Sequence, residues 1–239
     1  MTHFIVIDGT DGCGKATQVK LLGEKLEQLG YRVVKMDFPN YDSDSSAAVK
    51  MYLNGELGEN ASELNPYMCG SFYAVDRFII YTKYFKKYFE NESEDGRDTI
   101  ILSDRYLSAN IIHQASKIAD RKERRKYIRW CYEFECADAG MPVEDLTLIL
   151  TVPAEVSQKL MSKRYGGNEV KKDIHEKDVK YLSRCIDLLK EAVDYTQYIT
   201  VNNKAVNWKL LDCSDGDSIK PIEQISEEIL NLVLNTIKA

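Results

Sequence analysis

The stretch Gly9-Thr10-Asp11-Gly12-Cys13-Gly14-Lys15-Ala16-Thr17 decides the fold of this chain. The apolar run from Phe4 to Asp8 comes directly before it and is short enough to be a buried strand. After it, valine and leucine recur at helical spacing until Gly30 ends the pattern. A glycine-rich turn between a buried strand and a helix is typical of a phosphate-binding loop, because its backbone N–H groups can turn toward one anion. Lys15 can then reach the outer phosphates.

One position departs from the usual pattern of such loops. Position 16 should carry a serine or threonine hydroxyl that holds Mg²⁺, and here it is Ala16. The alternative interpretation is an ordinary strand-to-helix turn that needs glycine for its backbone angles. Three glycines, a Gly-Lys pair at the right offset and matching flanks favour nucleotide binding. The predicted nucleotide contacts are Gly9, Asp11, Gly12, Cys13, Gly14, Lys15, Ala16 and Thr17.

Composition describes a soluble globular protein. The chain has 239 residues, of which 44% are hydrophobic and 29% charged, with a net charge of −6. This charge does not favour a nucleic-acid or membrane surface, so we expect neither partner. No apolar run approaches the roughly 20 residues of a membrane span, and no signal peptide precedes Phe4. Six scattered cysteines without a Cys-x-x-Cys pair, and only three histidines, argue against zinc and predict reduced thiols and a cytoplasmic location.

Strand and helix patterns alternate along the chain. Predicted strands cover residues 4–8, 32–37, 99–103, 147–152 and 208–212. Predicted helices run from the loop to Gly30, over 47–53 and 63–89, up to Ile118, and over 123–137, 156–164, 179–193 and 222–237. This alternation predicts a parallel sheet covered on both faces, a three-layer α/β/α fold. Because no repeat or low-complexity linker divides the chain, we predict a single domain over residues 1–239.

The carboxyl ends of the strands are where such sheets bind ligands. Phe38-Pro39 follows the second strand, and Asp104-Arg105 follows the strand at 99–103. Asp104 beside a phosphate loop can hold Mg²⁺ directly or through water, and Arg105 can clamp a phosphate. The alternative is a surface Asp-Arg turn without a ligand, which the phosphate loop makes less favourable.

Two further patterns are compatible with a nucleotide site. Tyr73 and Arg77 are four residues apart and share one helix face, where one can stack on a base and the other hold its phosphate. The alternative is a core aromatic beside a solvated arginine. A basic segment interrupted by Gly166-Gly167 suits a mobile lid near 160–178, or else a charged surface loop. Its cations are Lys159, Lys163, Arg164, Lys171 and Lys172.

Taken together and in this order, these motifs resemble the thymidylate kinase family of nucleoside monophosphate kinases. The resemblance rests on the segment from Asp8 to Lys15, Phe38-Pro39, Tyr73-Ala-Val-Asp-Arg77, Asp104-Arg105-Tyr106 with Gln114, and the lid. It implies a P-loop NTPase fold with a roughly five-stranded parallel sheet. It also implies a homodimer. The implied reaction transfers the γ-phosphoryl group of ATP, with Mg²⁺, to a deoxynucleoside monophosphate, and dTMP is the first candidate for this acceptor.

The resemblance also implies roles for single residues. Asp11 would touch the acceptor sugar or order the site, and Phe38 would line the acceptor site. Tyr73 would stack on the base, Arg77 and Arg105 would hold the acceptor, and Gln114 would bond a base edge. Gly12 stands where some members carry a catalytic arginine, which implies a cation from the lid: Arg164 first, Lys172 second. The implied catalytic set is Lys15, Asp104, Arg105 and Arg164, with Asp104 holding the metal through water.

Departures from the family pattern leave alternatives open. Tyr41 stands near a position that often carries arginine, Ala109 at a usual serine, and His113 where tyrosine or phenylalanine is common. They concern the acceptor base, so a kinase for dGMP or dUMP remains an alternative. Ala16 motivates another one, a nucleotide-gated binding or regulatory P-loop protein.

Overall fold

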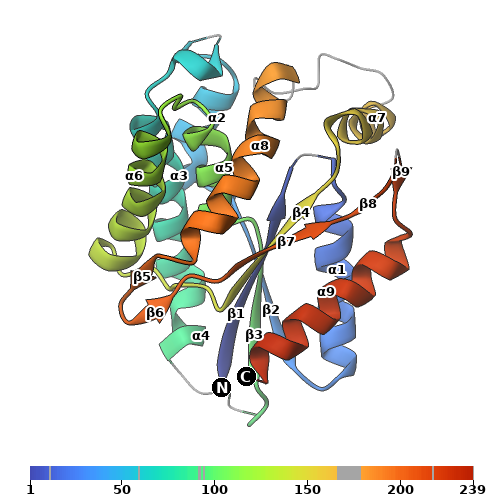
Figure 1. Cartoon of the computed structure of the whole chain (residues 1–239). Coiled ribbons are helices and arrows are strands. Elements are labelled where there is room, and N and C mark those ends of the chain that lie inside the picture. Colours follow the sequence, from blue (N-terminus) through green and yellow to red (C-terminus); the bar gives the residue numbers. More distant parts are fainter. Residues whose placement is uncertain are drawn as a thin grey trace.

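The computed structural model describes residues 1–10, 12–58, 60–90, 93, 95–165, 179–216 and 218–238. Its centre is a five-stranded parallel sheet in the order β2-β3-β1-β4-β7 (Figure 1). The strands in that order are β2 (Arg32–Asp37), β3 (Thr99–Asp104), β1 (Thr2–Gly9), β4 (Leu146–Thr151) and β7 (Trp208–Asp212). All five predicted strands are confirmed, and the three inner ones are continuous apolar runs because both of their faces are covered.

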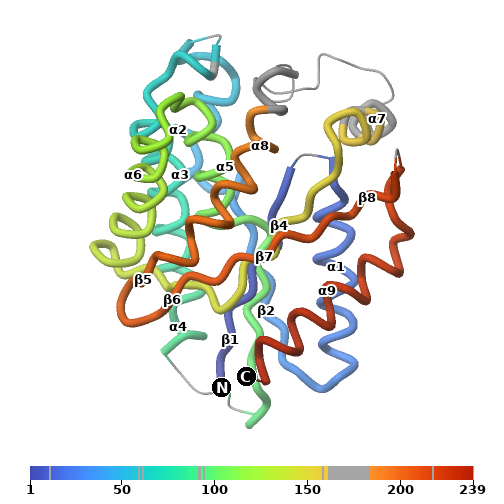
Figure 2. Tube along the Cα trace, in the orientation of Figure 1, coloured from blue at the N-terminus to red at the C-terminus, as the bar shows by residue number. Residues whose placement is uncertain are grey.

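Alternate residues of β1 enter two different cores. Phe4 and Val6 belong to one core, and Ile5 and Ile7 belong to the other. Helices on the first face are α2 (Ala47–Leu53), α3 (Pro66–Ile80), α5 (Leu107–Ala115), α6 (Arg121–Tyr132) and α8 (Val179–Thr196), as Figure 1 shows. Helices α1 (Lys15–Gln28) and α9 (Ile222–Ile237) cover the second face. Figure 2 traces the chain from the central β1 to α9 on the outside. The predicted three-layer α/β/α fold is confirmed.

Two helices depart from the regular pattern that their sequence predicts. The helix expected from residue 63 begins at Pro66, because the side chain of Asn65 accepts from the backbone N–H groups of Tyr67 and Met68. It passes through a π-helical turn, Tyr81–Phe85, into α4 (Lys86–Glu90). Helix α6 likewise continues into a π-helical turn, Glu133–Asp138. Such a turn contains one extra residue, which a search for 3.6-residue periodicity does not detect.

Short elements complete the described structure. Two antiparallel hairpins were not predicted, because each of their strands has two residues: β5 (Thr200–Val201) with β6 (Lys204–Ala205), and β8 (Ser214–Asp215) with β9 (Ser218–Ile219). Single 3₁₀ turns cover Asp44–Ser46 and Ala61–Glu63. Helix α7 (Ala154–Tyr165) leads toward the expected lid, and residues 166–178 of that lid lie outside the described residues.

Two features of the described structure concern membrane-spanning helices and disulfides. In the described part of the chain, no helix has the length and apolar character needed to cross a bilayer. All six cysteines lie within the described ranges; each is buried and none forms a disulfide.

Candidate active site at the carboxyl edge of the sheet

The glycine-rich loop connects β1 to α1. Gly12 and Gly14 have φ angles of +77° and +89°, in the left-handed region that glycine adopts without strain. Gly14 precedes the first residue of α1, and a Cβ added to it would meet no atom within 4 Å. The loop therefore presents an open face at the N-terminus of a 14-residue helix, where backbone N–H groups and the helix dipole favour an anion. Asp11 lies outside the described residues.

Lys15 is folded against its own loop. Its Nζ donates to the carbonyl oxygens of Gly9 and Thr10, at 2.9 and 2.8 Å, and the residue is 7% exposed. The ammonium group thus lies inside the loop that is predicted to bind phosphate. The buried hydroxyl Oγ1 of Thr10 finds no hydrogen-bond partner among the described residues. A buried hydroxyl without a hydrogen-bond partner at the loop is compatible with a polar ligand that bonds to it.

Asp8 connects the loop to the neighbouring helix α5. One carboxylate oxygen accepts from the backbone N–H of Gly9 at 2.8 Å, and the other accepts from the Ser108 hydroxyl at 2.5 Å. Burial raises the pKa of Asp8, while the positive charges of Lys15 and Arg105 act in the opposite direction. Asp8 therefore fixes the start of the loop relative to the start of α5. No local sequence pattern indicates this role of Asp8.

Asp104 is the last residue of β3, and Arg105 follows it, beside the loop. Asp104 is paired in register with Ile7 of β1 and Asp37 of β2. Burial and the nearby carboxylate of Asp104 raise the pKa of Asp37. Arg105 has a φ of +67°; its N–H donates to the Ile7 carbonyl at 3.0 Å, and its own carbonyl accepts from Ser103 at 2.6 Å. These two bonds hold a strained backbone at the centre of the site.

The donor chemistry at Asp104 fits magnesium. Its Oδ1 is buried and has no hydrogen-bond partner within the described part of the chain. Carboxylate oxygen is the ligand that Mg²⁺ prefers, and this ion is commonly held by one or two carboxylates together with water and phosphate. The described residues contain no group of three or more side chains that could hold a metal by themselves. The buried oxygen of Asp104 therefore suits a metal whose remaining ligands are water and phosphate oxygens.

A cavity opens next to Asp104. Its lining contains four of the predicted acceptor-site residues: Phe38, Tyr73, Arg77 and Arg105. The remaining lining residues are Pro39, Tyr41, Leu53, Tyr106, Ala109, Asn110 and His113. The fold thus gathers the segment after β2, the middle of α3 and the first turns of α5 around one space.

The cavity wall formed by the segment after β2 is fixed by Asp76. This buried carboxylate, next to Arg77 in α3, accepts from the backbone N–H of Asn40 at 3.0 Å and from the Ser45 hydroxyl at 2.5 Å. The bonds attach the segment that follows Phe38-Pro39 to the helix that carries Tyr73. Asp76 belongs to the motif Tyr73-Ala-Val-Asp-Arg77, but the motif alone does not indicate this role.

Gln114 lies elsewhere. It is completely buried, its Nε2 is 3.4 Å from the Tyr52 hydroxyl, and it does not line the cavity. Helix α5 and its N-cap residue Tyr106 line the cavity instead. The lining residues are Tyr106, Ala109, Asn110 and His113, and their spacing of three, four and seven residues places them on one face. That spacing is visible in the sequence and could have identified Asn110 and His113. The predicted base contact of Gln114 remains a prediction.

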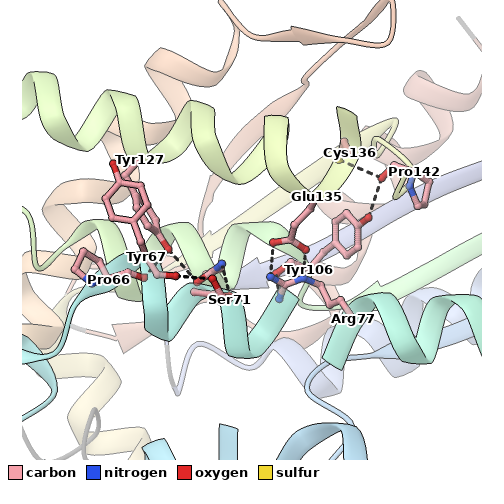
Figure 3. Close-up of polar contacts among 11 residues, drawn as sticks. Pro66, Tyr67, Ser71, Arg77, Tyr106, Tyr127, Glu135, Cys136 and Pro142 are labelled. Atoms are coloured by element: carbon pink, nitrogen blue, oxygen red, sulfur yellow. Dashed lines mark hydrogen bonds and ion pairs between the residues drawn. The ribbon is translucent and has the colours of Figure 1, made fainter. Parts of the chain in front are cut away.

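Arg77 is buried, in contrast to the solvated arginine of the alternative reading. Its Nε and Nη2 both donate to the carboxylate of Glu135, each at 2.6 Å, and its Nη1 is 3.4 Å from the Tyr106 carbonyl oxygen (Figure 3). Burial lowers the pKa of Arg77, but attraction to Glu135 and the hydrogen bonds to it outweigh burial and raise the pKa overall. Arg77 is therefore charged and almost fully compensated by one carboxylate. Nothing in the local sequence pattern indicated this partner.

The predicted lid cations are the least described part of the site. Arg164 belongs to the last turn of α7, and its side chain lies outside the description. Lys171 and Lys172 lie among residues 166–178, also outside the described residues. Their roles remain predictions from the sequence.

Comparisons with known proteins agree with this geometry. The family model described as thymidylate kinase matches residues 7–208. The chain is 30% identical to thymidylate kinase of Mycobacterium tuberculosis over 155 residues, 64% of this chain and 67% of that protein. It is 26% identical to a probable thymidylate kinase of Methanococcus maripaludis over 237 residues, 99% of this chain and 98% of the relative.

A solved structure gives the same result for the fold. The thymidylate kinase of Candida albicans superposes with a TM-score of 0.65 at 19% identity, covering 98% of this chain and 92% of that one. The family match extends from the end of β1 to the start of β7 and so includes the glycine-rich loop, the cavity and the lid. This chain belongs to the thymidylate kinase family and is a nucleoside monophosphate kinase, a phosphotransferase.

Proposed function

We propose that this protein transfers the γ-phosphoryl group of ATP to dTMP, giving dTDP and ADP, with Mg²⁺. The observation that carries the proposal is the direct connection of the loop to the cavity. Asp8 links Gly9 to Ser108, and the backbone of Arg105 bonds to Ile7 of the same β1 strand. A phosphate donor on the loop and an acceptor in the cavity would therefore be held in one fixed relation, which such a transfer requires.

The donor side would consist of the loop and Asp104. The loop N–H groups and Lys15 would bind the ATP phosphates, and Lys15 would exchange its bonds to Gly9 and Thr10 for phosphate oxygens. Asp104 would hold Mg²⁺ through water, and the bound ion would neutralise phosphate charge. Since Ala16 has no hydroxyl, we expect the other metal ligands to be ATP oxygens and water.

The acceptor side would use the two cavity arginines differently. Tyr73 would stack on the base, as an aromatic ring readily does. Arg105 would hold the acceptor phosphate. Arg77, whose charge is compensated by Glu135, suits a neutral oxygen of the base better than a phosphate. A general base is not needed, because a phosphate monoester is already largely ionised near neutral pH.

The lid would complete the site. We propose that residues 160–178 close over the transferring group as part of a single domain over residues 1–239. Arg164, with Lys172 as second candidate, would supply the cation that Gly12 does not.

The proposed assembly is a homodimer in the cytoplasm. Met68, Val75 and Phe78 on α3 are exposed apolar residues, and their spacing places them on one side of the helix. With the family resemblance, this face supports contact with a second copy of the chain. Buried cysteines without disulfides support a reducing compartment.

Turnover with a panel of acceptors tests the proposed reaction. ADP release would be measured with ATP and Mg²⁺ on dTMP, dUMP and dGMP, with an acceptor-free reaction as control. We expect dTMP to give the highest kcat/KM. A preference for dUMP or dGMP would identify the alternative acceptor, with Tyr41, Ala109 and His113 of the cavity as its determinants. ATP binding without turnover that depends on any of these acceptors would contradict the proposed reaction.

A further inference from the structure

The contact between Arg77 and Glu135 joins two segments that are 58 residues apart in the sequence. Figure 3 shows the carboxylate of Glu135 facing the guanidinium of Arg77, with Tyr106 beside them. Both carboxylate oxygens are engaged, since Oε2 accepts from Nε and Oε1 accepts from Nη2, each at 2.6 Å. Both side chains are 2% exposed. A bidentate pair of this kind fixes the plane of the guanidinium as well as its position.

The backbone around Glu135 is adapted to this contact. Glu135 lies in the π-helical turn Glu133–Asp138 that follows α6, and its carbonyl accepts from the N–H of Met141 at 2.9 Å. π-helical turns inside helices occur frequently at functional sites. Arg77 lines the cavity and Glu135 does not. The turn therefore places the buried carboxylate of Glu135 behind Arg77, outside the cavity.

The pair restricts what Arg77 can offer to a ligand. Nε and one hydrogen of Nη2 are used by Glu135, and Nη1 is directed near the Tyr106 carbonyl at 3.4 Å. The donors that remain lie on the side of the guanidinium away from Glu135. The pair thus prevents the Arg77 guanidinium from rotating, so that only the remaining N–H donors are available to the cavity.

We propose that Glu135 is a positioning residue for the acceptor: it holds the Arg77 guanidinium in the orientation that binds the acceptor nucleotide. The proposal rests on the proposed function, which makes the cavity the acceptor site. Glu135 itself touches no substrate. Its contribution is made before binding, by ordering a donor that would otherwise have to be ordered by the acceptor.

The test compares Glu135→Gln with Glu144→Gln. Glu144 is a matched control, because it is buried like Glu135 and accepts hydrogen bonds from Tyr132, Thr147 and Trp208, none of which lines the cavity. Steady-state kinetics with varied dTMP should show E135Q raising the acceptor KM about tenfold or more, with kcat changed less than about threefold. E144Q should keep the acceptor KM within about twofold of the wild type. A purely structural role would lower the melting temperature of both variants without a KM change in E135Q, and that result would overturn the proposal.

A second pair of variants covers the case in which E135Q does not fold. Arg77→Met and the double variant Arg77→Met/Glu135→Gln are compared, because the double variant leaves no unpaired buried charge. We expect R77M to raise the acceptor KM and the double variant to match R77M within about twofold. A further rise in the double variant would show that Glu135 acts other than through Arg77, and an unchanged KM in R77M would also reject the proposal.

The two proposals can fail separately. Wild-type turnover with dTMP reports on the proposed function, and the ratio of variant to wild type reports on Glu135. Equilibrium dialysis with labelled dTMP provides the same ratio for affinity without requiring turnover. An active wild type with an unchanged E135Q rejects the role of Glu135 alone, whereas a wild type that neither binds nor phosphorylates dTMP rejects both.

Discussion

At the scale of single residues, Arg77 and Arg105 are held beside the cavity by different contacts. Arg77 is paired with Glu135 in a buried, bidentate contact. Arg105 has a left-handed backbone that is held by Ile7 and Ser103. The bidentate pair fixes the donors that Arg77 can offer, and the backbone bonds fix where the Arg105 side chain begins.

Lys15 is the residue whose removal should affect catalysis most directly. Lys15→Met retains the aliphatic stem but removes the ammonium group. We expect kcat to fall about 10²- to 10³-fold, the range seen when one charge-stabilising donor is lost. Stability should fall by about 1–3 kcal/mol, because the buried carbonyls of Gly9 and Thr10 lose a donor. Steady-state turnover and urea denaturation measure the two effects separately.

The control for this prediction lies on the same helix. Lys25 is near the end of α1 and pairs with Glu227 at 2.5 Å, in a partly exposed contact. Lys25→Met should leave kcat within about twofold and change stability by less than about 1 kcal/mol. Normal turnover in K15M, or an equal loss in both variants, would contradict the role of Lys15.

At the scale of elements, the start of the glycine-rich loop is in close contact with β4. Gly9 has a φ of +145°, and a Cβ on it would lie 2.0 Å from the Leu150 carbonyl oxygen. The N–H of Thr10 donates to the same oxygen at 3.4 Å. The position of the loop is therefore determined by close approach to a neighbouring strand, in addition to its own glycines.

Gly9→Ala tests this contact, with Gly30→Ala as control. Gly30 also has a positive φ, +93°, but a Cβ there would meet nothing within 4 Å. Both substitutions should lose about 1–2 kcal/mol through backbone strain. G9A should lose a further ~1–3 kcal/mol because the Cβ must displace Leu150. Urea denaturation midpoints give the difference, and equal losses would show that the approach to β4 is unimportant.

At the scale of the whole molecule, the exposed apolar face of α3 predicts self-association. Val75 is 52% exposed on that face, between Met68 and Phe78. Val75→Glu places a charge there and should convert the proposed dimer to a monomer in sedimentation velocity, since an unpaired charge in an interface core opposes association. Tyr198→Glu is the control, because Tyr198 is 71% exposed between α8 and β5. A monomeric wild type, or a dimeric V75E, would reject the face as the interface.

The sequence by itself determined the strands, the glycine-rich loop and the helix after it. These elements depend on neighbouring residues: a short apolar run, glycines at positive φ and a helical period. It also indicated that Phe38 and Arg105 are near one ligand site, because the ends of parallel strands meet at one edge of the sheet. The place of Tyr73 and Arg77, which lie on a helix, was implied by the family resemblance.

The tertiary structure alone decided which side chains face the cavity and what they contact there. Helix α5 turns Asn110 and His113 into the cavity and Gln114 into the core, because its packing against α3, α6 and α8 sets its rotation. Glu135 contacts Arg77, which is 58 residues away in the sequence. Glu135 lies in a π-helical turn that the hydrophobic periodicity of the sequence does not predict. The glycine-rich loop, inferred first from its own residues, is held by Asp8 through Ser108 and by Leu150 of β4. Contacts between distant segments arise from packing, and local sequence patterns do not encode them.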